Sequence, residues 1–304
     1  MTIRSTIVLL LTALLAMQLD GQNAEDSKFK PAPIEVASDT MVFDMEAKRC
    51  DYTGNVKVVD DQFILTADEI SAFLDEDFQI ETIDATGHVV INHGGDKEAT
   101  GGTAKYDAVK NVATLLDNPK LYFGTNSGEG ANKIVFDRVN GLFTASGRTK
   151  WSIEQTASSA DGIPDPTGTP TIAMITCDDT VFDMTANICT FMGDVRVDDP
   201  RFTMKSEVTV AHLNDDMEVK RIESKGNIEI IHDKNKATGG KAVYNVDEDT
   251  VVLTEAPEVF LGENHGSGGA RVVYNRESGH FKAEGGFVWR IHRKDSDKKL
   301  LMPE

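Results

Sequence analysis

The sequence predicts an antiparallel all-β protein made of two tandem copies of one domain, and two observations support this. First, the chain repeats itself, because Val42-Phe43-Asp44-Met45 returns 139 residues later as Val181-Phe182-Asp183-Met184. Second, short segments alternate between apolar and polar residues and are separated by Gly, Asp and Asn. This alternation is typical of strands joined by hairpin turns. A repeat of this length means a duplicated domain.

The repeat extends over nearly the whole chain and sets the domain boundaries. Cys50 matches Cys189 at the same offset, and after a one-residue deletion Trp151 matches Trp289 at an offset of 138. We therefore expect copy one over residues 34–151 and copy two over residues 173–289. Residues 152–172 are rich in Ser, Gly, Pro and Asp and are interpreted as a linker. The length of 304 residues agrees with two domains of roughly 150 residues each.

The first residues are interpreted as a signal peptide, residues 1–24. Arg4 precedes an almost unbroken apolar run over residues 7–17, which is too short to span a bilayer comfortably. The sequence therefore predicts an exported, periplasmic protein, and an uncleaved short anchor is the alternative. Residues 290–304 form a basic tail.

Composition argues against several classes of function. A formal charge of −19 disfavours nucleic acid as a partner, because phosphate binding needs a basic face. Three cysteines argue against a disulfide framework. We expect Cys50 and Cys189 to be small buried apolar residues, and Cys177 to lie too far from Cys189 to bond with it.

Within each copy one face of every strand is apolar. In copy one Met41, Phe43 and Met45 alternate with polar or smaller residues, and similar short runs follow along the chain. The apolar faces must meet one another, as in a sandwich, a jelly roll or a flattened barrel. This face is either a packed core or the lining of an apolar groove, and periodicity does not choose between the two.

The sequence offers little for catalysis. The paired acids Asp60-Asp61 and Asp198-Asp199 lie within one residue of the same repeat position and are interpreted as turn residues. His93 and His232 also correspond, but neither has a second histidine at metal-ligand spacing. We therefore expect no enzyme activity, no metal and no cofactor.

The opening of the repeat resembles a known family. Residues 33–39, then Phe43-Asp44-Met45, then Tyr52-Thr53-Gly54-Asn55-Val56 resemble the start of an OstA-like domain of the LptA-type lipopolysaccharide-transport family. Later segments follow in the family's order, and both copies are covered. The resemblance implies two tandem antiparallel β-jelly rolls, each V-shaped with an open apolar interior.

The resemblance also implies a function. Such domains stack end to end by edge-strand pairing, and the groove carries acyl chains of lipopolysaccharide towards the outer membrane. The implied partners are lipopolysaccharide or lipid A, LptC-like and LptD-like transport components, and further copies of the chain in an end-to-end homo-oligomer. The alternative is a structural or interaction β-module of the cell envelope, with a filled core and no lipid cargo.

The lipid-binding residues that this function implies lie on the apolar strand faces. Ile34 and Val36 match the family's lipid-contacting positions, and the smaller Ala173 replaces the first of them in copy two. We expect Ile34→Asp or Phe43→Asp to abolish lipid capture without loss of β structure. The full predicted set is Ile34, Val36, Phe43, Met45, Tyr52, Val56, Phe63, Leu65, Tyr106, Phe123 and Phe136 in copy one, and Ile175, Phe182, Met184, Phe191, Val195, Phe202 and Tyr244 in copy two.

Overall fold

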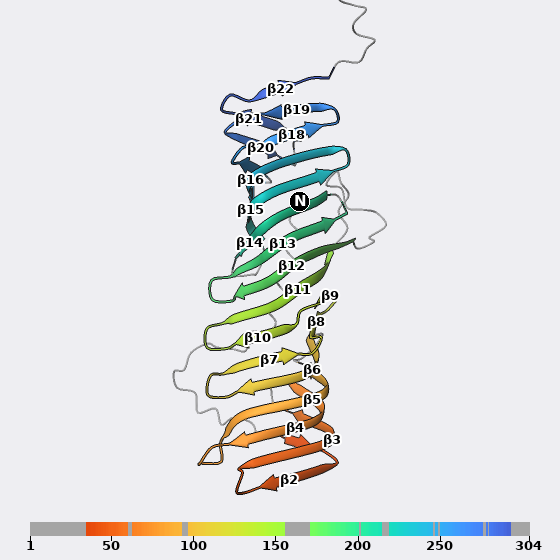
Figure 1. Ribbon diagram of the computed structural model, residues 1–304, viewed down its shortest axis with the longest axis vertical. Coiled ribbons are helices and arrows are strands. Elements are labelled where there is room, and N and C mark those ends of the chain that lie inside the picture. The colour runs from red at the N-terminus through yellow and green to blue at the C-terminus, as the bar shows by residue number, and fades with distance from the viewer. Residues whose placement is uncertain are drawn as a thin grey trace, which may run out of the picture.

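A computed structural model describes residues 35–59, 63–92, 97–155, 171–200, 202–214, 219–245, 247–248, 250–275, 278 and 280–292. The predicted signal peptide, residues 156–170 of the predicted linker and nearly all of the basic tail lie outside this range. The described residues are all-β, as predicted, and contain no helix. The strands run across the long axis of the molecule and are stacked along it, from β2 at one end to β22 at the other (Figure 1).

Each copy contributes eleven of the strands that the structure describes. Copy one contains β1 (Glu35–Ala37), β2 (Thr40–Asp44), β3 (Arg49–Val59), β4 (Ile64–Leu74), β5 (Ile80–Asn92), β6 (Lys97–Asp107), β7 (Val112–Leu116), β8 (Lys120–Phe123), β9 (Asn126–Glu129), β10 (Lys133–Asp137) and β11 (Leu142–Gln155). Copy two contains β12 (Thr171–Asp183), β13 (Ile188–Asp199), β14 (Phe202–Leu213), β15 (Val219–His232), β16 (Asn235–Asn245), β17 (Thr250–Thr254), β18 (Glu258–Leu261), β19 (Asn264–Ser267), β20 (Arg271–Asn275), β21 (Phe281–Glu284) and β22 (Val288–Arg290). All pairings are antiparallel, as in a jelly roll.

Each long strand belongs to two walls and bends where it passes from one to the other. On β3, residues 49–53 pair with β2 and residues 57–59 pair with β1. The register slips between these halves, at Gly54 and Asn55. We call the β2 side the first wall, the β1 side the second wall, and the line of such bulges the bend. The bend recurs at Gly87-His88, Gly147-Arg148, Gly193-Asp194 and Gly226-Asn227.

The sequence explains the bend locally. Gly54 has φ +80° and Asn55 has φ 48°, the left-handed region that favours Gly and Asn. A Cβ atom at Gly54 would lie 2.5 Å from Asp39 Oδ2, and Asn55 Nδ2 donates to that same oxygen at 2.8 Å. The bulge inserts extra residues into one strand, which bends the strand and increases its twist.

The two copies share one sheet, because β11 and β12 pair with each other from Leu142↔Asp183 to Gln155↔Thr171. On its other side β11 pairs with β10 in the first wall and with β9 in the second. Both walls therefore continue from copy one into copy two. We call the β11–β12 pairing the joint.

The main apolar core crosses the joint and includes residues of both copies, from Val56 to Val219. A smaller cluster around Ile228 and Leu253 follows towards the C-terminal end. The prediction of small buried cysteines is confirmed, because Cys50 and Cys189 are both buried. All three cysteines are free thiols.

Candidate functional site: the inward faces of the two walls

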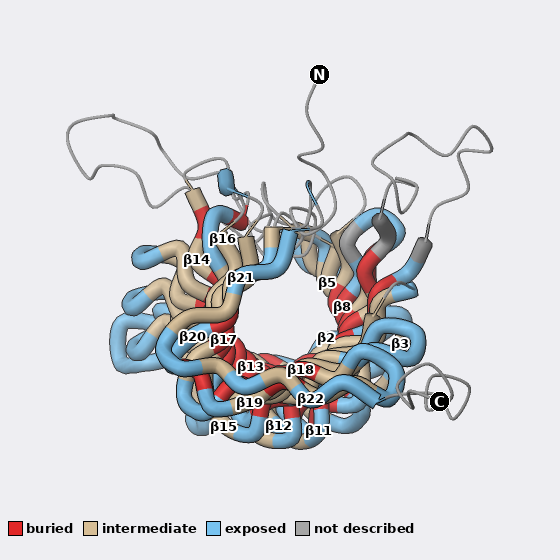
Figure 2. Tube along the Cα trace, turned by 90° about the horizontal axis from the view of Figure 1, so that it is seen from above, coloured by how far each residue is buried: buried red, intermediate tan, exposed pale blue. Residues whose placement is uncertain are grey.

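On several strands the inward residues beside the bend are the most deeply buried. On β5, Ala85 and Val89 flank the bulge and are almost fully buried, whereas Ile83 and Ile91, one inward position farther out, are only partly buried. Viewed along the long axis, the strands wrap around a common centre (Figure 2). On such strands the apolar face is closed at the bend and less covered towards the hairpin turns. Near the joint, Phe143, Phe182 and Cys189 are buried close to the hairpin turns as well.

Side-chain size follows the same direction on several strands. Residues beside the bend are often small, such as Ala67, Ala85 and Ala99. Larger apolar residues such as Leu65, Tyr106 and Phe136 lie nearer the hairpin turns and are partly buried. Small residues let the two walls approach at the bend, and large residues fill the wider space farther out.

The predicted lipid-binding residues divide into three groups by burial. Val56, Ile175, Phe182, Phe191 and Val195 are buried among protein atoms. Val36, Phe43 and Met45 are exposed at the N-terminal end of the sheet. The partly buried group consists of Tyr52, Phe63, Leu65, Tyr106, Phe136, Met184, Phe202 and Tyr244. Ile34 and the side chain of Phe123 lie outside the described residues.

Further apolar residues that the predicted set did not include are also partly buried. Val58, Ile83 and Ile91 in copy one, and Val197 and Ile222 in copy two, also pack against the core with partial exposure. The alternation of apolar residues that identified Leu65 runs through β5 and β13 as well. This signal was available in the sequence and could have identified them.

The polar groups on these faces are tied to neighbouring side chains. A hydrogen bond with Cys50, together with burial, raises the pKa of Tyr52 to about 12. The Tyr106 hydroxyl donates to Asn111 Oδ1 at 2.9 Å. The Tyr52 phenol is neutral at pH 7, so it supplies a hydroxyl group rather than charge. Across the part of the chain that the structure describes, no group of three His, Cys, Asp or Glu residues is placed to hold a metal.

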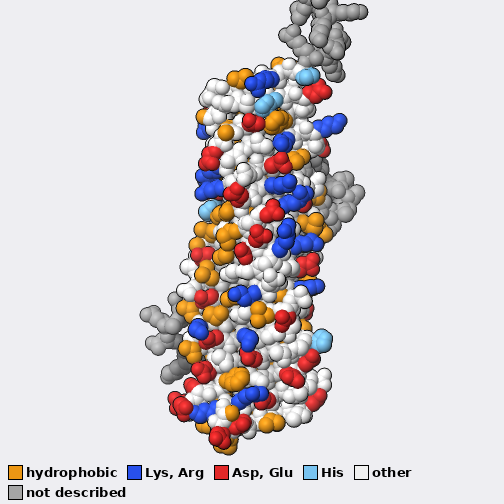
Figure 3. Space-filling model, in the orientation of Figure 1, with side chains coloured by type: hydrophobic (Ala, Val, Ile, Leu, Met, Phe, Trp, Pro, Cys, Tyr) orange, Lys and Arg blue, Asp and Glu red, His pale blue; other side chains and the backbone are white. Residues whose placement is uncertain are grey.

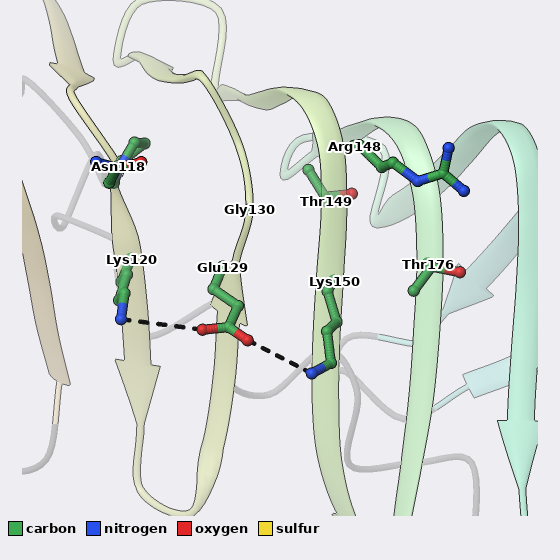
Figure 4. A pocket seen from close by; sticks show the side chains of 9 residues that line it. Asn118, Lys120, Glu129, Gly130, Arg148, Thr149, Lys150 and Thr176 are labelled. Carbon is green, nitrogen blue, oxygen red and sulfur yellow. Dashed lines mark hydrogen bonds and ion pairs between the residues drawn. The ribbon is translucent and has the colours of Figure 1, made fainter.

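The outer surface carries the charge. A concavity of about 670 Å³ lies beside the joint (Figure 4), where Glu129 stands between Lys120 at 4.0 Å and Lys150 at 3.5 Å. Their neighbours Leu121 and Trp151 are buried, so these three charged residues point outwards. Glu129 offsets one of the two positive charges. Acidic and basic side chains are interspersed over the face shown in Figure 3, which favours solubility.

The two ends of the sheet expose residues that the joint buries. Among the described residues, β2 pairs only with β3, and β21 pairs only with β20. Phe43 on β2 is 38% exposed, whereas its counterpart Phe182 is 0% exposed. Phe281 on β21 is 40% exposed, whereas its counterpart Phe143 is 2% exposed. We call β1 and β2 the N-terminal edge, and β21 and β22 the C-terminal edge.

Comparison with known families agrees with this architecture. The sequence matches the family described as LptA/(LptD N-terminal domain) LPS transport protein twice, over residues 35–141 and 174–280. The chain belongs to this family. The family comprises lipopolysaccharide-transport components, which are proteins of the periplasm or cell envelope, and is not a family of enzymes. Each match covers one copy, so the predicted resemblance is confirmed for both.

Among solved structures, the chain is similar to LptH, the LptA-homologous periplasmic component of the lipopolysaccharide transport device of Pseudomonas aeruginosa. The identity is 22%, the alignment covers 46% of this chain and 93% of LptH, and the TM-score is 0.34. No curated protein matches the sequence. Within the described residues no helix is long and apolar enough to cross a membrane.

Proposed function

We propose that the chain is a periplasmic bridge that carries lipopolysaccharide acyl chains along the inward faces of its two walls towards the outer membrane. The observation that carries the proposal is the joint. Because β11 pairs with strands of both walls and with β12, the inward apolar faces of the two copies are continuous. A lipid in transit would find one apolar path across both copies.

The partly buried group supplies the contact surface in this proposal. An exposed acyl chain costs about 0.8 kcal/mol per CH₂ in water, and large apolar side chains near the hairpin turns, such as Leu65 and Phe202, retain surface to cover it. The buried residues Val56 and Val195 already contact protein on all sides. We assign these two to the structural core rather than to the lipid path.

Photo-crosslinking tests the path. p-Benzoylphenylalanine replaces Leu65 or Tyr106 in copy one and Phe202 or Tyr244 in copy two, and the protein is irradiated with lipopolysaccharide. We expect crosslinks from both copies. The outward Lys57 and Lys205 are the matched controls. Crosslinks confined to one copy, or equal from inward and outward positions, contradict the proposal.

A second function, an envelope interaction module with a filled core, is favoured by one observation. Phe143, Phe182 and Leu121 are all buried to within 2% of full coverage, which is the packing of an ordinary core. This function predicts no lipid crosslink from any inward position. It also predicts that Leu65→Asp destabilises the protein without a separate effect on lipid capture.

The exposed edges suggest how the protein assembles. A sheet edge presents unpaired N–H and C=O groups that another strand can satisfy. We propose that the edges pair with LptC-like and LptD-like components and with further copies of the chain, after export directed by residues 1–24. Multi-angle light scattering of the mature protein tests self-pairing. We expect the average mass to rise with concentration, and a constant monomer mass contradicts self-pairing.

A further inference from the structure

A small cluster of buried polar side chains links β11 and β12 on the inward side of the joint. Thr149 on β11 is paired with Cys177 on β12, and its Oγ1 lies 3.0 Å from Cys177 Sγ and 3.1 Å from Thr180 Oγ1. Trp151 Nε1 donates to Thr180 Oγ1 at 3.0 Å. All four side chains are buried. Their hydrogen bonds are satisfied only when β11 and β12 meet in this register.

The C-terminal edge has lost its half of this cluster. Phe287 stands where copy one has Thr149, and it stacks on Trp289 with ring centroids 6.1 Å apart. Gly269 stands where copy one has Ala131, and a Cβ atom there would lie 2.8 Å from Phe287 Cδ2. The two replacements therefore fit each other, because loss of the Ala131 methyl group makes room for the Phe287 ring.

The N-terminal edge has lost the other half. Ser38 stands where copy two has Cys177, and Met41 stands where copy two has Thr180. Met41 is exposed. If the N-terminal edge met a C-terminal edge in the register of the joint, Met41 would take the place of Thr180 beside Trp289, opposite Ala283. Methionine packs favourably on aromatic rings, whereas Met41 placed on Thr149 would leave a buried hydroxyl without a partner.

Charge points to the same register on the outer face. At the joint Ser152 is paired with Met174. The residues at these two positions of the free edges are Arg290 and Glu35, and both are exposed. In the joint register, opposite charges would therefore stand directly across the new strand pair, which stabilises cross-strand neighbours.

From these observations we propose that the two free edges are complementary to each other, so that each binds the opposite edge of a second copy of this chain. The N-terminal edge of one copy pairs with the C-terminal edge of another in the register of the joint, with Met41 on the Phe287–Trp289 pair and Glu35 opposite Arg290. The free N-terminal edge lacks Cys177 and Thr180, the partners that the buried Thr149 needs. The joint therefore forms only between β11 and β12 of one chain. This inference rests on the edge pairing proposed above and adds its register and its specificity.

Disulfide crosslinking tests the register. The joint pair Lys150↔Thr176 corresponds to Val288 and Ala37 at the free edges, both exposed. Directly opposed antiparallel residues have Cα atoms about 4.5–5.5 Å apart, within reach of a disulfide. We mix full-length Ala37→Cys with full-length Val288→Cys under mild oxidation and expect a mixed dimer. Ala37→Cys mixed with Lys282→Cys is the out-of-register control and should give none.

Charge reversal tests the specificity. We expect Glu35→Arg and Arg290→Glu each to weaken self-association by about fivefold, the upper range for a surface ion pair, and the double variant to restore it. Lys225→Glu, an exposed reversal away from both edges, controls for net charge and should leave association unchanged.

A third variant set tests the contacts between the inward faces of the two edges. Phe287→Thr with Gly269→Ala makes the C-terminal edge resemble the joint, and we expect about tenfold weaker association with the native N-terminal edge. Adding Ser38→Cys and Met41→Thr should restore it. If wild-type protein stays monomeric at all concentrations, both the edge pairing and its proposed register and contacts are overturned. Two other results would leave the pairing standing and overturn its proposed register and contacts. One is a mixed dimer that forms equally well with Lys282→Cys, and the other is that neither compensated variant recovers association.

Discussion

The joint and the free edges are built from the same repeat positions but differ in the length and continuity of their strands. At the joint, β11 and β12 are continuous strands of 14 and 13 residues. At the N-terminal edge the counterpart of β12 is divided into β1 and β2, of 3 and 5 residues, and at the C-terminal edge the counterpart of β11 is divided into β21 and β22, of 4 and 3 residues. The strands that are paired on both sides are therefore long and unbroken, and their counterparts paired on one side are short and divided.

This difference teaches that burial in this fold depends on neighbours as well as on sequence. Phe43 and Phe182 occupy the same position in nearly the same local sequence, yet one is exposed and the other is covered by β11. The strand that covers Phe182 comes from the other copy, and among the described residues β2 has no strand in that place. The experiments below test how residues in or next to the joint differ from those in or next to an edge, using dilute monomeric protein.

The largest expected effect separates Phe182 from Phe43. Phe182→Ala removes a ring from a fully buried site opposite Phe143 and should lower the free energy of unfolding by about 3–5 kcal/mol. Phe43→Ala removes a ring that is 38% exposed and less closely packed, and it should lower the free energy of unfolding by less than about 1.5 kcal/mol. Urea unfolding followed by tryptophan fluorescence measures both. Equal losses would mean that the N-terminal edge is covered in solution even in the monomer.

The next effect concerns the polar cluster. Thr180→Val leaves Trp151 Nε1–H and the Thr149 hydroxyl without their shared partner, and should lower the free energy of unfolding by about 1–3 kcal/mol. The matched change Met41→Val at the exposed edge should stay within about 0.5 kcal/mol. The same urea titration reports both values. No loss from Thr180→Val would show that water or another group satisfies the cluster.

The repeat explains why so much of the fold could be predicted from sequence. Alternation placed Tyr52, Val56 and Leu65 on one apolar face, and they do pack inwards. Alternation gives the side of the strand but not the depth. Depth depends on the neighbouring strands and walls, since Cys50 is buried although it lies farther from the bend than the partly buried Tyr52. The predicted lipid-binding set therefore mixed the buried Val56 with the partly covered Leu65. That lipid contacts either residue remains a prediction.

The relation between the copies could not be predicted, although β11 and β12 follow each other in the sequence. The linker composition allowed many angles. What fixes the arrangement is the β11–β12 ladder and the cluster of Thr149, Cys177 and Thr180. Thr149 and Thr180 interrupt an apolar pattern, and comparing them with Phe287 and Met41 would have marked them as special to the joint.

Thiol reactivity gives a smaller and more local difference between the same regions. Cys50 faces Phe43 on the edge strand β2, and Cys189 faces Phe182 on β12. Burial raises the pKa of the Cys189 thiol, so it should react only when the strands around it, β12 and β14, open. Cys50 should be alkylated by iodoacetamide through local opening of β2, at least about tenfold faster. Tandem mass spectrometry reads both rates. Similar rates would contradict weaker protection at the edge.

The smallest expected effect is a pH dependence confined to the C-terminal edge. Hydrogen bonds from Arg271, with Nε at 2.5 Å, and from Lys282 lower the pKa of Glu284 to about 2. Its folded pKa lies below the unfolded value of 4.5, so its contribution is present above about pH 4.5 and is lost as pH falls towards 2. The joint has Ser146 at this position and lacks the effect.

Hydrogen exchange of the β20–β21 amides at pH 5 and pH 2.5, expressed as protection factors, measures this local loss. Because Glu284 is on the surface, we expect a small decrease in protection. Glu284→Gln is the control, since its amide does not titrate, and it should remove most of the decrease. If the variant loses protection over the same interval as the wild type, other carboxylates cause the effect. The acid sensitivity of this edge would then not arise from the Arg271–Glu284–Lys282 contacts.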